Sequence, residues 1–139
     1  QARAKALSDG YVKDKAAELD RTEEYPWETT KKLTEAGFMG MTIPKEYGGQ
    51  GASYLDAVLV IEQMARNCGV TGRIVVEANM GGIGAIMAYG SEEQKQRWLP
   101  KMASGELVSA IAMTEPGTGS DLQAVATTAI KQGDHYLQL

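Results

Sequence analysis

The sequence predicts an α+β protein of more than one domain, in which an all-α helical bundle is followed by the first strands of a β domain. Over residues 2–36 and 53–102, apolar residues recur at three- and four-residue spacing, which is the period of amphipathic helices. Beyond Gly105, short apolar runs alternate with polar, glycine-containing loops, as strands do. Helices segregated from strands indicate two joined domains, with expected ranges 1–105 and 106–139.

The first half of the helical part contains two expected helices and a loop. Residues 2–19 have helical spacing that Gly10 interrupts only weakly. A polar linker over residues 20–26 separates them from a second helix over residues 27–36, for which Gly37 is a candidate stop. Residues 38–52 are rich in glycine and proline, so we expect a tight connecting loop there.

The second half contains three further helices. Ser53 is a candidate N-cap for the first of them. Residues 70–89 are apolar on nearly all sides and predict one helix buried in the bundle. Ser91 and Gln94 fit a capping box for the last helix, over residues 92–102.

The composition argues against several classes of protein. The net charge is −4 with acids and bases interleaved, so nothing draws the chain to nucleic acid or to anionic lipid. Its single cysteine, Cys68, cannot form an internal disulfide and suits a reducing compartment. No apolar run approaches the length of a membrane span, and the N-terminus lacks a signal-peptide pattern, so we do not expect secretion. The lone His135 has only Asp134 beside it, and no metal site is expected.

A polar loop over residues 114–121 is the centre of the expected β domain. An apolar run over residues 108–113 predicts a strand before it, and residues 124–130 predict a strand after it. Gly117 and Gly119 remove the steric penalty of a positive φ. Such a loop can turn several main-chain N–H groups toward one place, which suits an anion or the polar edge of a heterocycle. Three hydroxyl groups can join them, those of Thr114, Thr118 and Ser120.

One carboxylate lies in an unusual place. Glu77 occurs within the apolar stretch over residues 70–89, where a charged group needs a partner. It could line a cavity or face another helix.

The nine residues 113–121, MTEPGTGSD, resemble the first signature of the acyl-CoA dehydrogenase flavoproteins. Gly-Thr-Gly stands where many members have Gly-Ala-Gly. The connector PKEYGGQG, residues 44–51, is similar to a Pro-x-x-Tyr-Gly-Gly-x-Gly loop of the same family.

This resemblance implies a subunit with an N-terminal helical domain, a middle β-barrel or β-sandwich domain and a C-terminal helical bundle, assembled as a homotetramer or homodimer. It implies FAD as cofactor and an acyl-CoA thioester as substrate, oxidised at its α and β carbons with hydride transfer to flavin N5. An electron-transferring flavoprotein is the implied electron acceptor, and the bacterial cytoplasm or mitochondrial matrix the implied location. The alternatives are an acyl-CoA oxidase or flavin mono-oxygenase on the same fold, a non-catalytic binding homologue, or a plain helical interaction domain.

Carried over by position, the resemblance also implies site residues. The expected cofactor-binding residues are Ile111, Ala112, Met113, Thr114, Gly117, Thr118, Gly119 and Ser120. The expected substrate-binding residues are Ser120, Val75, Val76 and Asn79. The catalytic glutamate is expected beyond Leu139, so no catalytic residue is predicted in this chain, and Glu115 is expected to be structural. We expect the chain to end within a strand and to catalyse nothing by itself.

Overall fold

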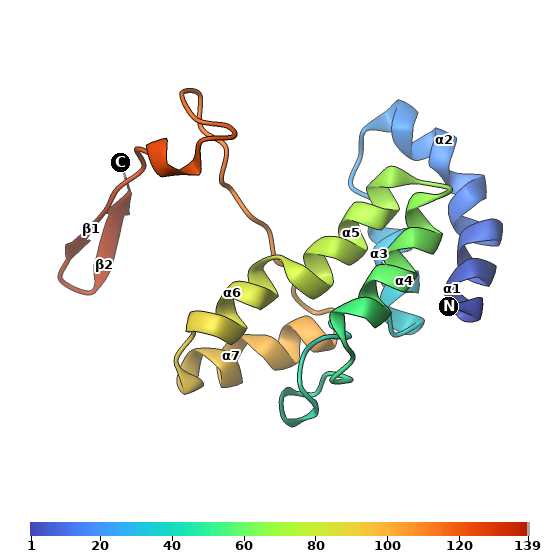
Figure 1. Ribbon diagram of the computed structural model, residues 1–139, viewed down its shortest axis with the longest axis horizontal. Helices are drawn as coiled ribbons and strands as arrows, with labels where there is room; N and C mark the ends of the chain where they lie inside the picture. Colours follow the sequence, from blue (N-terminus) through green and yellow to red (C-terminus); the bar gives the residue numbers. More distant parts are fainter. Residues whose placement is uncertain (139) are drawn as a thin grey trace.

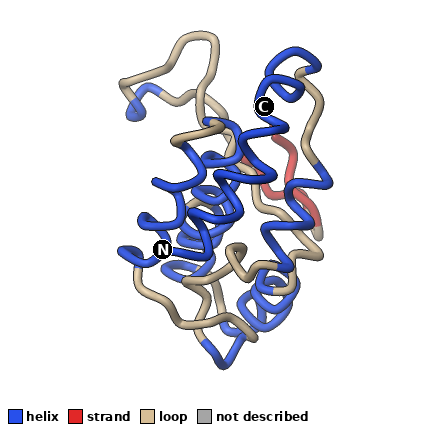
Figure 2. The backbone as a smooth tube through the Cα atoms, turned by 90° about the vertical axis from the view of Figure 1, so that its right-hand side faces the viewer, coloured by secondary structure: helices blue, strands red, loops and turns tan. Residues whose placement is uncertain are grey.

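The computed structural model describes residues 1–138 and confirms the predicted class, a mostly helical chain that ends in a two-stranded sheet. Within this range seven α-helices form one body, and the hairpin stands apart from it (Figure 1). The perpendicular view in Figure 2 shows that strand structure is confined to this hairpin. The helices are α1 (Ala2–Leu7), α2 (Lys13–Thr22), α3 (Trp27–Glu35), α4 (Tyr54–Ala65), α5 (Gly69–Met80), α6 (Gly82–Tyr89) and α7 (Glu92–Ala103).

The N-terminal helix is longer than predicted and contains a π-helical turn. This turn, η1 (Ser8–Val12), includes Gly10 and connects α1 to α2, which continues to Thr22. The Ser8 hydroxyl is buried and donates to the main-chain carbonyl of Gln63 in α4. The widened turn therefore fastens the N-terminal helix to the body.

The predicted caps and stop are confirmed. Gly37 follows α3 with a φ of +73°, a conformation that ends helices and suits glycine. At α4, the Ser53 hydroxyl accepts from the Asp56 N–H at 3.2 Å, and the Asp56 carboxylate accepts from the Ser53 N–H at 2.9 Å. Ser91 and Gln94 form the same reciprocal pair at α7. Each box satisfies N–H groups that the helix itself cannot pair.

The prediction of one helix over residues 70–89 is wrong, because α5 and α6 are separated at Gly81, which has a ψ of −117°. A Cβ on Gly81 would lie 2.3 Å from Oε2 of Glu77. A Cβ on Gly82 would lie 2.9 Å from the Cβ of Ser109. The break thus occurs where missing side chains leave room for a carboxylate and for a returning segment of chain.

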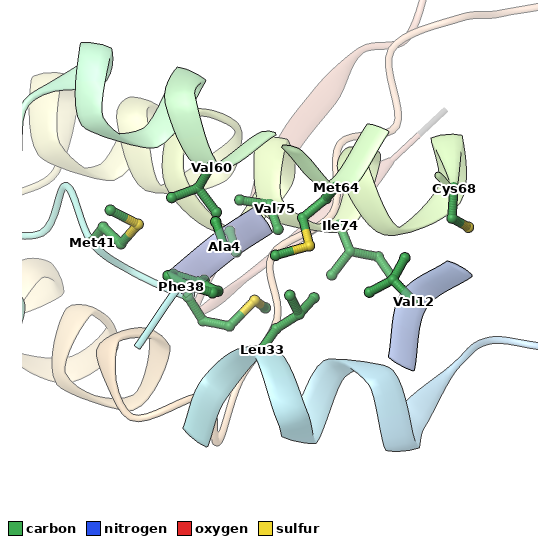
Figure 3. Close-up of a cluster of buried hydrophobic side chains, with 12 residues drawn as sticks. Ala4, Val12, Leu33, Phe38, Met41, Val60, Met64, Cys68, Ile74 and Val75 are labelled. Carbon is green, nitrogen blue, oxygen red and sulfur yellow. The ribbon is translucent and has the colours of Figure 1, made fainter. Parts of the chain in front are cut away.

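Two apolar clusters hold the helical body together. The larger cluster lies among α1, η1, α3, α4 and α5 (Figure 3) and consists of Ala4, Val12, Leu33, Phe38, Met39, Met41, Val60, Met64, Cys68, Ile74, Val75 and Ala78. The smaller one joins the connector to α6 and α7 and consists of Ile43, Tyr47, Ile83 and Leu99.

The buried side chain of Asn79 ties the connector to α5. Its Oδ1 accepts from the Met41 N–H at 2.7 Å. Its Nδ2 donates to the carbonyls of Phe38 and Val75 at 2.9 and 2.8 Å. All three bonds are needed, because a buried amide without partners costs several kcal/mol, roughly 2–7 by transfer measurements.

The strands differ most from prediction. Among the described residues, only β1 (Ala129–Gln132) and β2 (His135–Gln138) pair, in antiparallel register. Residues 108–113 are irregular, so the predicted strand there is wrong, and the predicted strand over residues 124–130 begins only at Ala129. A strand needs the N–H and C=O groups of a neighbour, and no other described segment supplies them. Leu139, the last residue of the expected final strand, lies outside the described residues.

Two adjacent glycines in the connector provide a matched test of the packing. After the 3-10 turn η2 (Lys45–Tyr47), a Cβ on Gly49 would lie 2.0 Å from the main-chain oxygen of Ile43. Gly49→Ala is therefore expected to lower the free energy of unfolding by about 3 kcal/mol or more. Gly48→Ala meets only the cost of its φ of +83°, about 1–2 kcal/mol. Urea unfolding followed by circular dichroism measures both, and equal losses would contradict the packing at Gly49.

Candidate functional site

The polar loop after the helical body is held by its own hydrogen bonds. Glu115 and Thr118 exchange two main-chain bonds of 3.0 and 3.1 Å, which close a tight turn over Pro116 and Gly117. The Thr118 hydroxyl donates to the Ala124 carbonyl at 2.9 Å. Thr118 is buried by these contacts while most residues around it are exposed. The loop is thus an ordered structure on the surface.

The Glu115 carboxylate accepts hydrogen bonds with both oxygens. The N–H of Ala126 donates to Oε2 at 2.9 Å, and the N–H of Thr127 donates to Oε1 at 3.0 Å. The Thr127 hydroxyl also donates to Oε1. These donors, the hydroxyl above all, hold the pKa of Glu115 below its ordinary value. A carboxylate with a lowered pKa is a poor general base at neutral pH, which agrees with the expected structural role.

The backbone conformation of the two loop glycines differs from the prediction, because neither Gly117 nor Gly119 has a positive φ. The turn over Pro116 and Gly117 is therefore open to residues other than glycine, as type I turns are. A Cβ on either glycine would meet no heavy atom within 4 Å. Nothing in the described chain requires glycine at these two positions.

A groove with a volume of about 580 Å³ lies between α5 and the segment that returns from α7. This segment passes the junction of α5 and α6 (Figure 1), where the Ser109 hydroxyl donates to the Glu77 carbonyl at 3.1 Å. The groove is lined by Tyr25, Gly69, Val70, Arg73, Ile74, Glu77, Val108, Ser109, Ala110 and Ile111.

One charged pair lies among the apolar walls of the groove. Arg73 and Glu77, one helical turn apart, form an ion pair in which the Arg73 side chain is 70% exposed and the Glu77 side chain 17% exposed. Oε2 of Glu77 is buried and has no hydrogen-bond partner among the described residues. Of the two alternatives that the sequence left open for Glu77, the structure favours the side chain that lines a cavity.

The predicted site residues fall into three environments. Ile111 is exposed and lines the groove. Of the remaining predicted cofactor residues, Thr118 is buried, and the exposed ones are Ala112, Met113, Thr114, Gly117, Gly119 and Ser120. Among the residues predicted to border an acyl pocket, Val76 is half-buried, whereas Val75 and Asn79 are fully buried in the helical core. The groove-lining residues of α5 are instead Arg73, Ile74 and Glu77.

Sequence reasoning missed Arg73 and Tyr25 as site residues. A cation four residues before a carboxylate on one helix is a recognisable surface pair, and this signal could have drawn attention to Arg73. No local pattern links Tyr25 or α5 to residues 108–111, since only the folded chain brings them together.

Two further classes of site are not found among residues 1–138. No group of three or more histidine, cysteine, aspartate and glutamate side chains there could hold a metal ion. None of the described helices combines the length and the apolar character needed to cross a bilayer.

Comparison with known proteins gives the family. The family model described as "Acyl-CoA dehydrogenase, N-terminal domain" matches residues 1–106. The chain belongs to the acyl-CoA dehydrogenase family. The earlier resemblance, based on the loop and connector motifs, is thereby confirmed.

The family contains relatives with different names. The chain is 51% identical to the 3-sulfinopropanoyl-CoA desulfinase of Variovorax paradoxus over 99% of its own length and 34% of that protein. It is 40% identical to the short-chain specific acyl-CoA dehydrogenase of Clostridium acetobutylicum over 94% and 35% of the two lengths. A solved glutaryl-CoA dehydrogenase in complex with glutaryl-CoA superimposes with a TM-score of 0.91 at 33% identity, covering 99% of this chain and 36% of that one. The chain therefore spans about a third of the length of these acyl-CoA dehydrogenase relatives.

The hydrogen bonds to Glu115 predict a measurable titration. Because its pKa is lowered in the folded chain, their contribution to loop stability is complete above the ordinary pKa of 4.5 and is lost as the pH falls through the lowered value. In an NMR titration, the amide resonances of Ala126 and Thr127 should shift with a midpoint below 4.5.

Thr127→Val removes the donor with the largest effect, so it should move this midpoint upward. A midpoint at or above 4.5 in the unsubstituted chain would contradict the hydrogen bonds described for Glu115.

Proposed function

We propose that the whole protein containing this chain is an oxidoreductase that binds FAD and an acyl-CoA thioester and removes hydrogen from the α and β carbons of the acyl group. The observation that carries the proposal is the exposed loop of residues 114–121, ordered by its own hydrogen bonds in a chain of the acyl-CoA dehydrogenase family. Apart from Glu115 and Thr118, the residues of this loop are exposed, and among the described residues no heavy atom lies within 4 Å of a Cβ placed on Gly117 or Gly119.

The fit of the loop to a flavin is supported by its glycines and by the segment before it. Gly117 and Gly119 meet no neighbour and have no unusual φ, so close approach by a group outside the described chain explains why side chains are absent there. Ile111 and Met113 expose about half of their surface, at 50% and 51%. Apolar side chains beside polar hydroxyl and N–H groups suit a planar ring with a polar edge.

The cofactor-binding residues that the resemblance implies have distinct roles in the proposed site. FAD, when bound, supplies the acceptor for the hydride. Thr114 donates a hydrogen bond toward the edge of the ring and stabilises negative charge there. Ser120 faces the thioester. The other members of the proposed set are Ile111, Ala112, Met113, Gly117, Thr118 and Gly119.

The proton of the α carbon needs a base, and the carboxylates within the loop of residues 114–121 are those of Glu115 and Asp121. Glu115 is unsuitable, because both of its oxygens are occupied by donors and its pKa is lowered. We therefore propose that a carboxylate after residue 139 removes this proton.

The groove beside α5 is the proposed place for the far end of the acyl group. Its walls are mainly apolar, and Val76 lies one residue from its lining. Val75 and Asn79, which were predicted to contact the substrate, are fully buried. We propose that they act on the groove indirectly, by fixing the position of α5.

A second reaction is favoured by one observation, the exposed Arg73 guanidinium in this groove. The relative in Variovorax paradoxus is named for removing the sulfino group of 3-sulfinopropanoyl-CoA, an acyl group with an anionic end. If this protein shares that reaction, the C–S bond breaks, water is consumed, and propanoyl-CoA and sulfite are released. No electron acceptor is needed, because this hydrolysis transfers no electrons to or from an external compound.

The remaining proposals follow from the family. An electron-transferring flavoprotein would reoxidise the cofactor in the dehydrogenation reaction, and the whole subunit would form a homotetramer or homodimer. The bacterial cytoplasm or the mitochondrial matrix is the proposed location.

The two reactions can be separated with the full-length protein. A dehydrogenase should lose its flavin absorbance under anaerobic conditions when butyryl-CoA is added. A desulfinase should release sulfite from 3-sulfinopropanoyl-CoA without an electron acceptor. A protein that neither binds FAD nor responds to either thioester would contradict the proposed function.

Arg73→Met tests how the groove selects its substrate. Loss of a charged hydrogen-bond donor costs about 1.5–3 kcal/mol, so KM for 3-sulfinopropanoyl-CoA should rise about tenfold or more while KM for butyryl-CoA changes little. Arg97→Met in α7, where the guanidinium lies over the Trp98 ring and outside the groove, is the matched control. Equal changes for both substrates would show that Arg73 acts only through its ion pair with Glu77.

A further inference from the structure

The hydrogen bonds of the polar loop converge on one side chain. The Glu115 carboxylate reaches eleven and twelve residues along the chain to Ala126 and Thr127. We call these three residues the carboxylate clamp. The other hydrogen bonds in the loop join residues that are closer in the sequence, such as the bond of 3.1 Å from the Ala124 N–H to the Asp121 carbonyl.

The clamp is the strongest restraint available to this part of the chain. All residues from 119 to 138 are exposed, and Thr118 is the single buried residue between Ser109 and that stretch. Without apolar burial, the shape of the loop depends on hydrogen bonds. Those that involve a charged acceptor are roughly twice as strong as neutral ones, and Glu115 receives three.

The clamp also joins the two sides of the proposed flavin site. Residue 115 directly follows the segment that lines the groove with Ile111 and carries Thr114. Thr127 lies two residues before β1. Holding residue 115 to residue 127 therefore fixes where the chain enters and where it leaves Gly117–Ser120.

We infer that Glu115 is a positioning residue for the cofactor, which holds the main chain on both sides of residues 117–120 in the shape that receives FAD before FAD is bound. This inference rests on the proposed function. Preorganising a binding loop improves affinity because less conformational entropy is lost on binding. Glu115 acts through the loop and touches no reacting atom.

The test uses the full-length protein in its flavin-free form with three variants. Glu115→Gln keeps the size of the side chain but turns an NH₂ group toward a main-chain N–H. Thr127→Val removes one of the three donors and keeps the shape. Glu106→Gln is the matched control, because Glu106 is 63% exposed and has only a distant ion pair with Lys101, at 3.6 Å. FAD affinity is measured by titration, unfolding by circular dichroism, and protection of the 126 and 127 amides by hydrogen exchange.

The expected result is a graded loss of FAD affinity at an unchanged unfolding midpoint. The dissociation constant for FAD should rise about tenfold or more in Glu115→Gln, in line with loss of charged hydrogen bonds. It should rise a few-fold in Thr127→Val, by about the effect of one bond, and stay unchanged in Glu106→Gln. Exchange at residues 126 and 127 should speed up in the first two variants.

Two results would overturn the inference. Wild-type FAD affinity in Glu115→Gln would show that the clamp does not prepare the loop. An affinity loss matched by a lower unfolding midpoint would show that Glu115 only stabilises the fold. If the unsubstituted protein takes up no FAD, the proposed function fails together with the inference. If the unsubstituted protein and Glu115→Gln bind FAD equally well, the inference alone is overturned.

Discussion

The three hydrogen bonds of the buried Asn79 amide are the constraint on which the helical body depends. Two of them join α5 to the connector at Met41 and Phe38, and the third lies within α5. They hold the connector where it passes from the larger apolar cluster, which contains Phe38 and Met41, to the smaller one, which contains Ile43. An apolar side chain of similar size would leave the Met41 N–H and the Phe38 carbonyl without their partner in the core, which costs more than it gains in packing. Because α5 cannot slide, its outer face is presented at a defined place, and that face forms one wall of the groove.

The chain uses different forces before and after Gly105. The helices are held by burial of apolar side chains, with capping boxes that satisfy the ends of α4 and α7. The loop after them is held by hydrogen bonds at the surface, above all those to Glu115. A packed core gives a rigid platform, whereas a surface loop held by polar bonds stays open to a ligand. This division suits the proposed site, in which the helices would border the substrate and the loop would meet the cofactor.

The junction between the two parts depends on missing side chains. Gly81 leaves room for the Glu77 carboxylate, and Gly82 lets Ser109 approach α6 closely. The Ser109 hydroxyl then bonds the Glu77 carbonyl, which the break in the helix leaves free. The returning segment is fastened at this point, so the groove is a direct consequence of the interruption between α5 and α6.

Local chemistry in the sequence was sufficient to predict much of the helical body around this junction. Ser53 and Ser91 at the helix starts, and Gly37 at the end of α3, act through contacts within a few residues, so their roles could be predicted without the fold.

The rest was decided by contacts between distant parts of the chain. Ser109 packs against Gly82 at the helix break, and the place of Asn79 in the core depends on Phe38 and Met41. The run over residues 108–113 has the composition of a strand, yet a strand forms only where another segment pairs with it. The sequence by itself determined which segments are helical, where they are capped and, through the closely specified residue types of the motif over residues 113–121, which family the chain belongs to. Only the tertiary structure decided which side chains line the groove, because periodicity records which face of a helix is apolar and not what packs against it.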